Sequence, residues 1–218
     1  MNERTNMTDE LDAAEGLIAG GQANLAVELL ERLAADAEEY VDRTCPTTDE
    51  VQWFSFPTIF ERLCYRRVEK DPRELKDVGE PLDRLYADLA FALVNEGDYA
   101  AATEALRQAV RWNPMGCGYR LDLAELYRTN GDVDEYLALT FSVFERASDV
   151  RHLVRAFCNF ARHFMDTGAD SAASGDRNLA TTLTVRARDL VGAPAVKALL
   201  ELIRSTDAEN GGADHADA

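Results

Sequence analysis

The chain has 218 residues, and its 40 acidic and 23 basic side chains give a formal charge of −17. This charge opposes binding to a phosphate backbone or an anionic membrane, because affinity for phosphates depends on Lys and Arg. We therefore expect neither DNA nor a membrane as partner. The N-terminus shows no basic-then-apolar signal and no apolar run approaches ~18 residues, which predicts a cytoplasmic protein.

Two helices are predicted in the first 42 residues, after a disordered N-terminus at 1–7. Apolar or small residues recur at helical spacing on both sides of a glycine pair: Ala13, Ala14, Leu17, Gly20, Gly21, Ala26, Leu30 and Leu33. Residues 1–42 carry 11 acidic and two basic side chains, a balance typical of a solvated helix face.

Residues 43–81 break this pattern. Pro46 and the polar residues after it predict a loop and a new helix start, and residues 71–81 predict a short helix or loop. Trp53, Phe54 and Phe56 concentrate aromatic rings, and apolar residues over 59–68 keep helical spacing. An exposed aromatic patch would mark a partner site. The interpretation we favour is that the rings fill the gap between neighbouring helix pairs.

The clearest signal lies at residues 82–115. An apolar face at spacings of three and four, from Leu82 to Val94, predicts a first helix that is joined at residues 95–98 to a second, alanine-rich helix. Gly97 supplies the turn because a residue without Cβ adopts positive φ easily. Pro114 ends the second helix because it lacks a backbone donor.

This unit resembles the tetratricopeptide repeat (TPR), a helix–turn–helix of 34 residues. The matching positions are Tyr86, Leu89, Ala90, Leu93, Gly97, Tyr99, Ala102, Leu106, Ala109 and Pro114. The order of segments is similar to an uncharacterised bacterial type of TPR protein. The resemblance implies an all-α, right-handed array of antiparallel helix pairs, an α–α superhelix with about nine to eleven helices.

The repeat pattern divides the chain as follows. We expect one helical-repeat domain over 8–204 and a disordered acidic tail over 205–218. The domain comprises a degenerate repeat (8–40), a divergent insert (43–81), the best repeat (82–115), a repeat (117–148), a repeat with an expanded turn (149–192) and a capping helix (194–204). The expanded turn begins at Asp166, where a polar run replaces the short turn seen at Gly97.

A cationic helix face is predicted in the fourth copy. At about 100° per residue, the residues Arg151, His152, Arg155, Asn159, Arg162 and His163 fall within about 120°, and this arc contains no Asp or Glu. In an array of this type the first helix of each copy lines the concave surface. Since guanidinium groups match carboxylates, the arc predicts a groove that binds an anionic peptide or protein segment.

The predicted ligand groove combines side chains of three copies: Phe91, Leu121, Arg128, His152, Arg155, Asn159 and Arg162. By resemblance, Arg155 and Asn159 stand where carboxylate-clamp TPR proteins carry Lys and Asn. The clamp is incomplete, because Ala87 and Phe91 occupy the equivalent places of the central unit. The alternative is that the arginines only neutralise nearby acids: Glu125, Glu145 and Asp149.

No metal, cofactor or catalytic site is predicted. His152 and His163 lie about 16 Å apart along a helix, and the residues Cys45, Cys64, Cys117 and Cys158 form no CxxC pair, so we expect reduced, mostly buried thiols. Catalytic motifs are lacking. We predict a non-enzymatic protein-interaction scaffold. A structural module that associates with its own copies, and a helical-repeat RNA binder, are the alternatives.

Overall fold

The computed structural model describes residues 6–170, and the side chains of residues 6–166. The chain divides into two compact units, Met1–Arg146 and Ala147–Ala218, which are described separately. The single domain expected over 8–204 is therefore divided, between the predicted repeats 117–148 and 149–192. Helical arrays permit such a division because each helix pair contacts only its neighbours.

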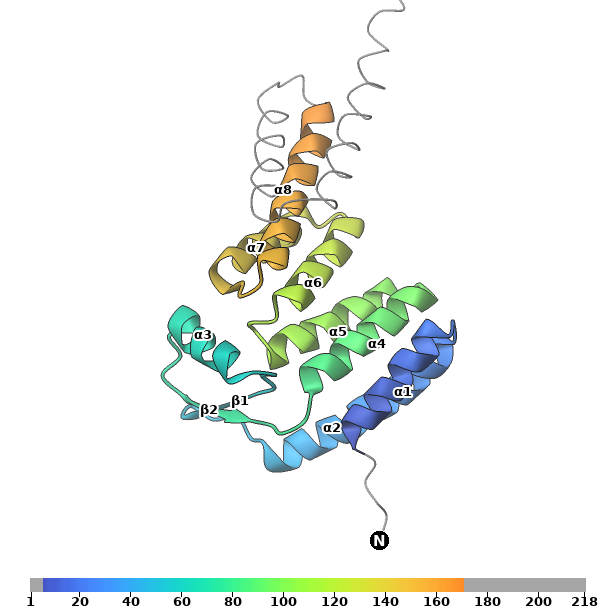
Figure 1. The fold of residues 1–218 in the computed structure, drawn as a ribbon, viewed down its shortest axis with the longest axis vertical. Helices are drawn as coiled ribbons and strands as arrows, with labels where there is room; N and C mark the ends of the chain where they lie inside the picture. Colours follow the sequence, from blue (N-terminus) through green and yellow to red (C-terminus); the bar gives the residue numbers. More distant parts are fainter. Residues whose placement is uncertain (1–5, 171–218) are drawn as a thin grey trace, which may run out of the picture. The chain divides into compact units, whose positions relative to one another are not determined.

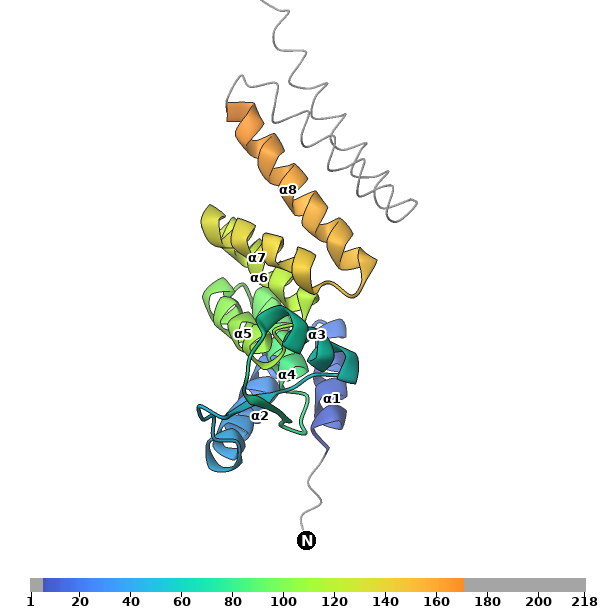
Figure 2. The same cartoon turned by 90° about the vertical axis from the view of Figure 1, so that its left-hand side faces the viewer.

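Three helix pairs follow one another in the first unit, as Figures 1 and 2 show. They are α1 (Met7–Ala19) with α2 (Ala23–Thr44), α4 (Leu82–Glu96) with α5 (Tyr99–Trp112), and α6 (Cys117–Thr129) with α7 (Val133–Arg146). The pairs coincide with the predicted repeats 8–40, 82–115 and 117–148. The all-α helical-repeat class is thus confirmed, with eight helices in residues 6–170.

Each pair turns at a glycine in the left-handed region of backbone space. The φ angles are 74° at Gly21, 83° at Gly97 and 83° at Gly131. A side chain with Cβ is strained at such an angle, which explains why the turns repeat the same residue. After the second of these turns, the Asp98 carboxylate accepts a hydrogen bond from the Ala101 amide (3.0 Å) and caps α5.

A continuous apolar core joins the three pairs. Leu30 of α2 and Leu85 of α4 are fully buried, and so are the small residues Ala92, Ala102 and Ala109. Alanines at these positions let helix backbones approach closely, so the large side chains of the neighbouring pair fill the remaining space. The apolar spacing predicted from the sequence therefore corresponds to the buried faces.

The insert between the first two pairs contains a small sheet. Strand β1 (Val51–Phe54) pairs in parallel with β2 (Glu74–Asp77), and α3 (Ile59–Glu69) connects them. The prediction of a helix start after Pro46 was wrong, and so was that of a helix or loop throughout 71–81. Two four-residue strands are too short to show alternating polarity clearly. The helical spacing over 59–68 was correct, since α3 occupies it.

The aromatic rings of the insert mostly pack inward. Phe54 is buried, with ring centroids 4.8 Å from Phe56 and 4.6 Å from Tyr65. The Trp53 indole donates a hydrogen bond to the Pro46 carbonyl (3.1 Å). These contacts support the interpretation that the rings fill the gap beside the helix pairs, whereas the exposed large apolar side chains of the insert belong to α3.

Helix α8 (Val150–Asp170) is the described helix of the second unit. It continues through Asp166, where we predicted the expanded turn, up to Asp170, the last residue that the structure describes. The later part of that turn, the capping helix 194–204 and the tail 205–218 lie outside the described residues. At the other end of the chain, α1 begins at Met7 with Asn6 as its N-cap, so these two residues belong to the helix and not to the predicted disordered segment. For residues 1–5, which lie outside the described residues, the disorder stays a prediction.

The four cysteines are free thiols, of which Cys45 and Cys117 are buried. Among residues 6–170, no helix is long and apolar enough to cross a membrane.

The shared core predicts unequal effects for two leucines of α2. Leu30 is fully buried and Leu25 is exposed, so Leu30→Ala leaves a cavity while Leu25→Ala does not. We expect the first change to lower the free energy of unfolding by about 2–5 kcal/mol, and the second by about 0.5 kcal/mol or less. Urea denaturation measures both, and similar losses would contradict the packing described here.

Candidate functional site

The polar faces of α1 and α4 meet at Arg84. Its guanidinium donates hydrogen bonds to Asp12 (2.5 Å) and Glu15 (2.7 Å) of α1. A third carboxylate, Asp88, lies 3.6 Å from the Arg84 Nε atom. Three carboxylates thus surround one cation, and this face, which we call the α1–α4 face, carries an excess of negative charge.

Asp88 is the least satisfied of these carboxylates. Its Oδ2 atom is buried and has no hydrogen-bond partner among the described residues. Burial raises the pKa of Asp88 to about 7, and the charges of Glu15, Asp12 and Asp83 add to this effect, while Arg84 opposes it. The carboxyl group therefore changes its protonation close to neutral pH.

Phe91 lies one helical turn beyond Asp88 on α4. Its side chain is 60% exposed, although α4 buries most of its other large residues. An accessible aromatic ring beside charged groups has the composition of a protein contact, where aromatic side chains are enriched. Phe91 is therefore accessible to a ligand, and its place in a binding groove stays a prediction.

Two further predicted groove residues lie on α6. Leu121 is fully buried, so it belongs to the core and is unavailable to a ligand; its place in the repeat pattern did not reveal which neighbour covers it. Arg128 donates to Glu125 of the same helix from both Nε (3.0 Å) and a terminal nitrogen (2.6 Å). These hydrogen bonds engage two donor nitrogens of Arg128 within α6.

The remaining predicted residues lie on α8, in the second unit. Arg155 and Arg162 are exposed and His152 is half-buried, whereas Asn159 is only 5% exposed. The predicted groove residues therefore lie on two separate faces, one in each unit. Asn159 offers little surface to a ligand on the α8 face.

The neutralisation alternative holds for one arginine of that helix. Arg151 donates to Asp149 from Nε (2.8 Å) and from a terminal nitrogen (2.5 Å). These hydrogen bonds lower the pKa of Asp149 to about 2. Arg151 therefore serves as the counter-ion of Asp149.

A buried carboxylate connects the insert to the repeats. Asp83 accepts hydrogen bonds from Ser55 Oγ (3.1 Å), Asn113 Nδ2 (3.1 Å) and the Tyr119 hydroxyl (3.2 Å). Burial raises its pKa, and these hydrogen bonds partly offset the rise. Its donors come from positions up to 36 residues away in the sequence, so local patterns gave no signal.

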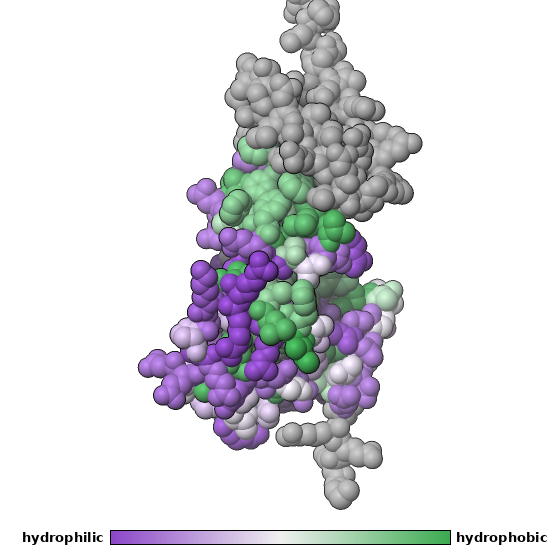
Figure 3. All heavy atoms as spheres, turned by 60° about the vertical axis from the view of Figure 1, so that its left-hand side comes forward, coloured by the Kyte–Doolittle hydropathy of each residue, from purple (hydrophilic) through white to green (hydrophobic). Residues whose placement is uncertain are grey.

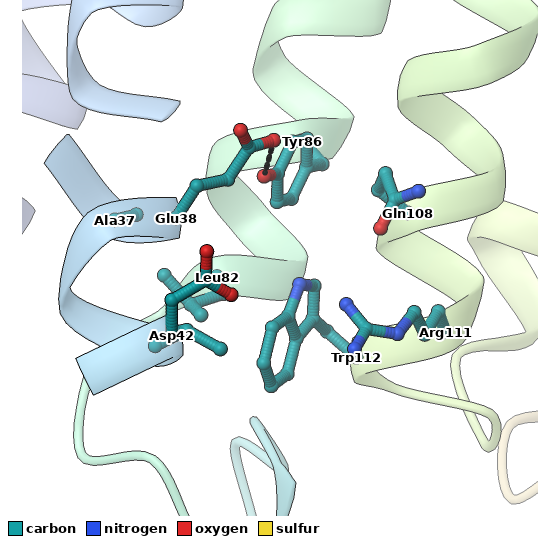
Figure 4. A pocket seen from close by; sticks show the side chains of 9 residues that line it. Ala37, Glu38, Asp42, Leu82, Tyr86, Gln108, Arg111 and Trp112 are labelled. Carbon is teal, nitrogen blue, oxygen red and sulfur yellow. Dashed lines mark hydrogen bonds between the residues drawn. The ribbon is translucent and has the colours of Figure 1, made fainter. Parts of the chain in front are cut away.

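A cleft of about 280 Å³ lies between α2, α4 and α5 (Figure 4). One wall carries Glu38, which accepts a hydrogen bond from the Tyr86 hydroxyl (3.2 Å). The opposite wall carries Arg111, whose guanidinium lies 4.7 Å from the centre of the Trp112 ring. The Trp112 indole nitrogen has no partner among the described residues. Sequence reasoning missed this cleft because its walls come from distant helices.

These sites offer contacts for binding but no activated nucleophile. Burial raises the pKa of the Cys117 thiol to about 11, so the thiol stays protonated and reacts poorly. Within the described residues, no group of three or more His, Cys, Asp or Glu side chains could hold a metal ion.

The paired helices, their glycine turns and their shared core define the class of the protein as a TPR-like helical repeat. No family model matches the chain, and no curated protein matches it.

Distant similarity exists to solved structures. One contains nearly identical TPR-like repeats of a Podosopora anserina protein provisionally assigned as a kinesin light chain; identity is 18%, coverage 96% of this chain and 99% of that chain, and the TM-score 0.47. Another is a Bacteroides ovatus ATCC 8483 protein provisionally assigned as protein binding, with 16% identity, coverage of 94% and 99%, and a TM-score of 0.43. These values are too low to carry an argument about function.

The position of Asp88 predicts a pH dependence of stability. Its pKa is about 7 in the folded protein, against an ordinary value of 3.8. The folded state therefore binds the proton more tightly, and this stabilisation is lost as the pH rises through about 7. Between about pH 5 and about pH 8, we expect wild type to lose about 1–3 kcal/mol more unfolding free energy than Asp88→Asn.

Urea denaturation across this pH range tests the expectation. Glu31→Gln, which removes an exposed carboxylate of α2, is the matched control and should follow the wild-type profile. Parallel profiles for wild type and Asp88→Asn would show that Asp88 does not titrate in this range.

Proposed function

We propose that the protein is a non-enzymatic scaffold that binds a segment of a partner protein. The binding surface is the exposed side of the helix that comes first in each repeat. The observation that carries this proposal is the exposure of Phe91 beside charges supplied by two different helices. Arg84 is already fixed by carboxylates of α1, so the α1–α4 face is pre-organised. A pre-organised surface binds with a smaller loss of side-chain entropy.

The charge of the α1–α4 face defines the chemistry of its ligand. The carboxylates of Asp12 and Glu15, which are 63% and 53% exposed, outnumber the Arg84 guanidinium. A partner segment that presents Lys or Arg next to a large apolar side chain would pair with these exposed carboxylates and cover Phe91. We propose this chemistry for the first unit.

The exposed polar side of α8, which we call the α8 face, is proposed to prefer a ligand of the opposite charge. Arg155 and Arg162 are exposed on an arc without carboxylates, and the guanidinium group binds carboxylates with two parallel hydrogen bonds. We propose that this face contacts an acidic peptide segment or a chain terminus. The two faces are separate proposals, and each has its own test.

Phe91 is the position at which the first proposal is tested. A photo-reactive benzoylphenylalanine at position 91 should crosslink to a protein segment in cells that make this chain, and the same group at position 99 should not. Tyr99 is also an exposed aromatic residue, so it is a matched control. Phe91→Ala should weaken binding of the crosslinked segment by about 1–2 kcal/mol.

The crosslinked peptide identifies the ligand directly by mass spectrometry. Equal crosslinking from both positions, or a segment without basic and apolar residues, would contradict the proposal for the α1–α4 face.

A double charge reversal tests the α8 face. Arg155→Glu with Arg162→Glu should abolish capture of an acidic segment, because the guanidinium donors are replaced by repelling carboxylates, and helicity by circular dichroism should stay unchanged. Arg32→Glu with Arg43→Glu reverses two exposed arginines of α2 and is the control. Retained binding in the α8 variant would reject an anion-binding role for this face.

A further inference from the structure

Helix α3 exposes three large apolar side chains in adjacent turns. Ile59 is 80% exposed, Phe60 is 59% exposed and Leu63 is 62% exposed. In Figure 3 a green patch lies at the level of α3 and is bordered by purple, hydrophilic side chains. The opposite side of α3 is occupied, since Tyr65 packs into the small core of the insert. The three exposed side chains are therefore not part of that core.

The same side of α3 is cationic. At 100° per residue, the exposed arc of about 160° contains these three apolar residues and three basic residues of the helix: Arg62, Arg66 and Arg67. Lys70 follows the helix as its C-cap, with a φ of 53°, and is also exposed. Arg62 donates to the Leu75 carbonyl. In the described part of the chain, Arg66, Arg67 and Lys70 make no hydrogen bond or ion pair, and all three are exposed.

The carboxylates of α3 lie elsewhere and are engaged. Glu69 forms an ion pair with Arg146 of α7, and Glu61 is half-buried near Thr58, whose hydroxyl lies 3.4 Å from its carboxylate. Burial and the nearby Asp83 charge raise the pKa of Glu61. No carboxylate of this helix therefore neutralises the arc of exposed cations.

The position of α3 is fixed from several sides. Tyr65 packs against Phe54 (4.6 Å between ring centroids), and its hydroxyl donates to Asp71 (3.0 Å). The contacts of Arg62 with β2 and of Glu69 with α7 hold the two edges of the helix. The apolar and cationic side chains are thus presented on a rigid support.

We propose that this arc of α3, the α3 face, is a third docking site, for a short acidic segment of a partner protein that presents carboxylates around two or three large apolar side chains. Charge complementarity identifies this occupant. The apolar side chains of the segment would cover Ile59, Phe60 and Leu63, while its carboxylates would pair with Arg66, Arg67 and Lys70. The proposal is independent of the α1–α4 face, whose ligand has the opposite charge.

Other occupants fit these observations less well. A symmetric contact with a second copy would place the cations of one α3 face against those of the other. An anionic membrane would have to approach a chain with a formal charge of −17, whereas a short segment meets only the local cations. Since α3 is about 16 Å long, the segment needs no more than about three helical turns, and the small area favours a transient complex.

Fluorescence anisotropy tests the α3 face on the full chain carrying Arg155→Glu with Arg162→Glu, so that the α8 face, which is also proposed to bind an acidic segment, does not contribute. The probe is a labelled 14-residue peptide with Leu and Phe on one helical side and Glu elsewhere. We expect saturable binding, weakened at least tenfold by Ile59→Ser with Leu63→Ser and by Arg66→Glu with Arg67→Glu. Phe141→Ser removes an exposed aromatic side chain of α7 and should leave binding unchanged. Circular dichroism verifies that each variant folds.

Three comparisons make the result decisive. A peptide with Lys in place of Glu, and a scrambled acidic peptide without an apolar side, should each bind at least tenfold more weakly. Absent binding of the acidic peptide, or equal binding of its scrambled form, overturns the proposal. If phosphatidylglycerol vesicles bind the chain and the same double substitutions abolish that binding, the α3 face would instead be a membrane-binding site. Crosslinking at position 91 has no bearing on these outcomes.

Discussion

Helix α4 is packed on two sides at once, and the first unit depends on this constraint. A single helix pair cannot bury both of its apolar faces, so α4 must cover α5 within its own pair and α2 of the preceding pair. Leu85 and Ala92, both fully buried, belong to the core shared by these helices. The small side chain keeps the helices close, and the large one fills the space between them.

The Asp83 carboxylate then ties the insert to this framework. Burying a charge is costly unless its hydrogen bonds are satisfied, and three donors from separate segments provide them: Ser55, Asn113 and Tyr119. These donors fix the insert relative to α4 and to the start of α6. The position of α3, which follows β1, therefore depends on these polar contacts together with its own contacts to β2 and α7.

The parts of the fold that obey the repeat pattern could be predicted from the sequence, because helical periodicity and the glycine turns are local signals. The strands could not, since each has four residues and its partner lies more than 20 residues away. Leu121 shows a second limit: its register indicated a first-helix surface, yet packing buries it completely. Periodicity defines which residues share a face, but the neighbouring element decides whether that face is exposed.

The net charge of the chain conceals an uneven distribution of charges. Carboxylates predominate on the α1–α4 face, while α3 exposes Arg66, Arg67 and Lys70 without a carboxylate on the same side. At physiological ionic strength, charges are screened beyond about 8 Å, so a short bound segment responds to the side chains that it touches. A strongly acidic protein can therefore still offer a local cationic site to an acidic peptide.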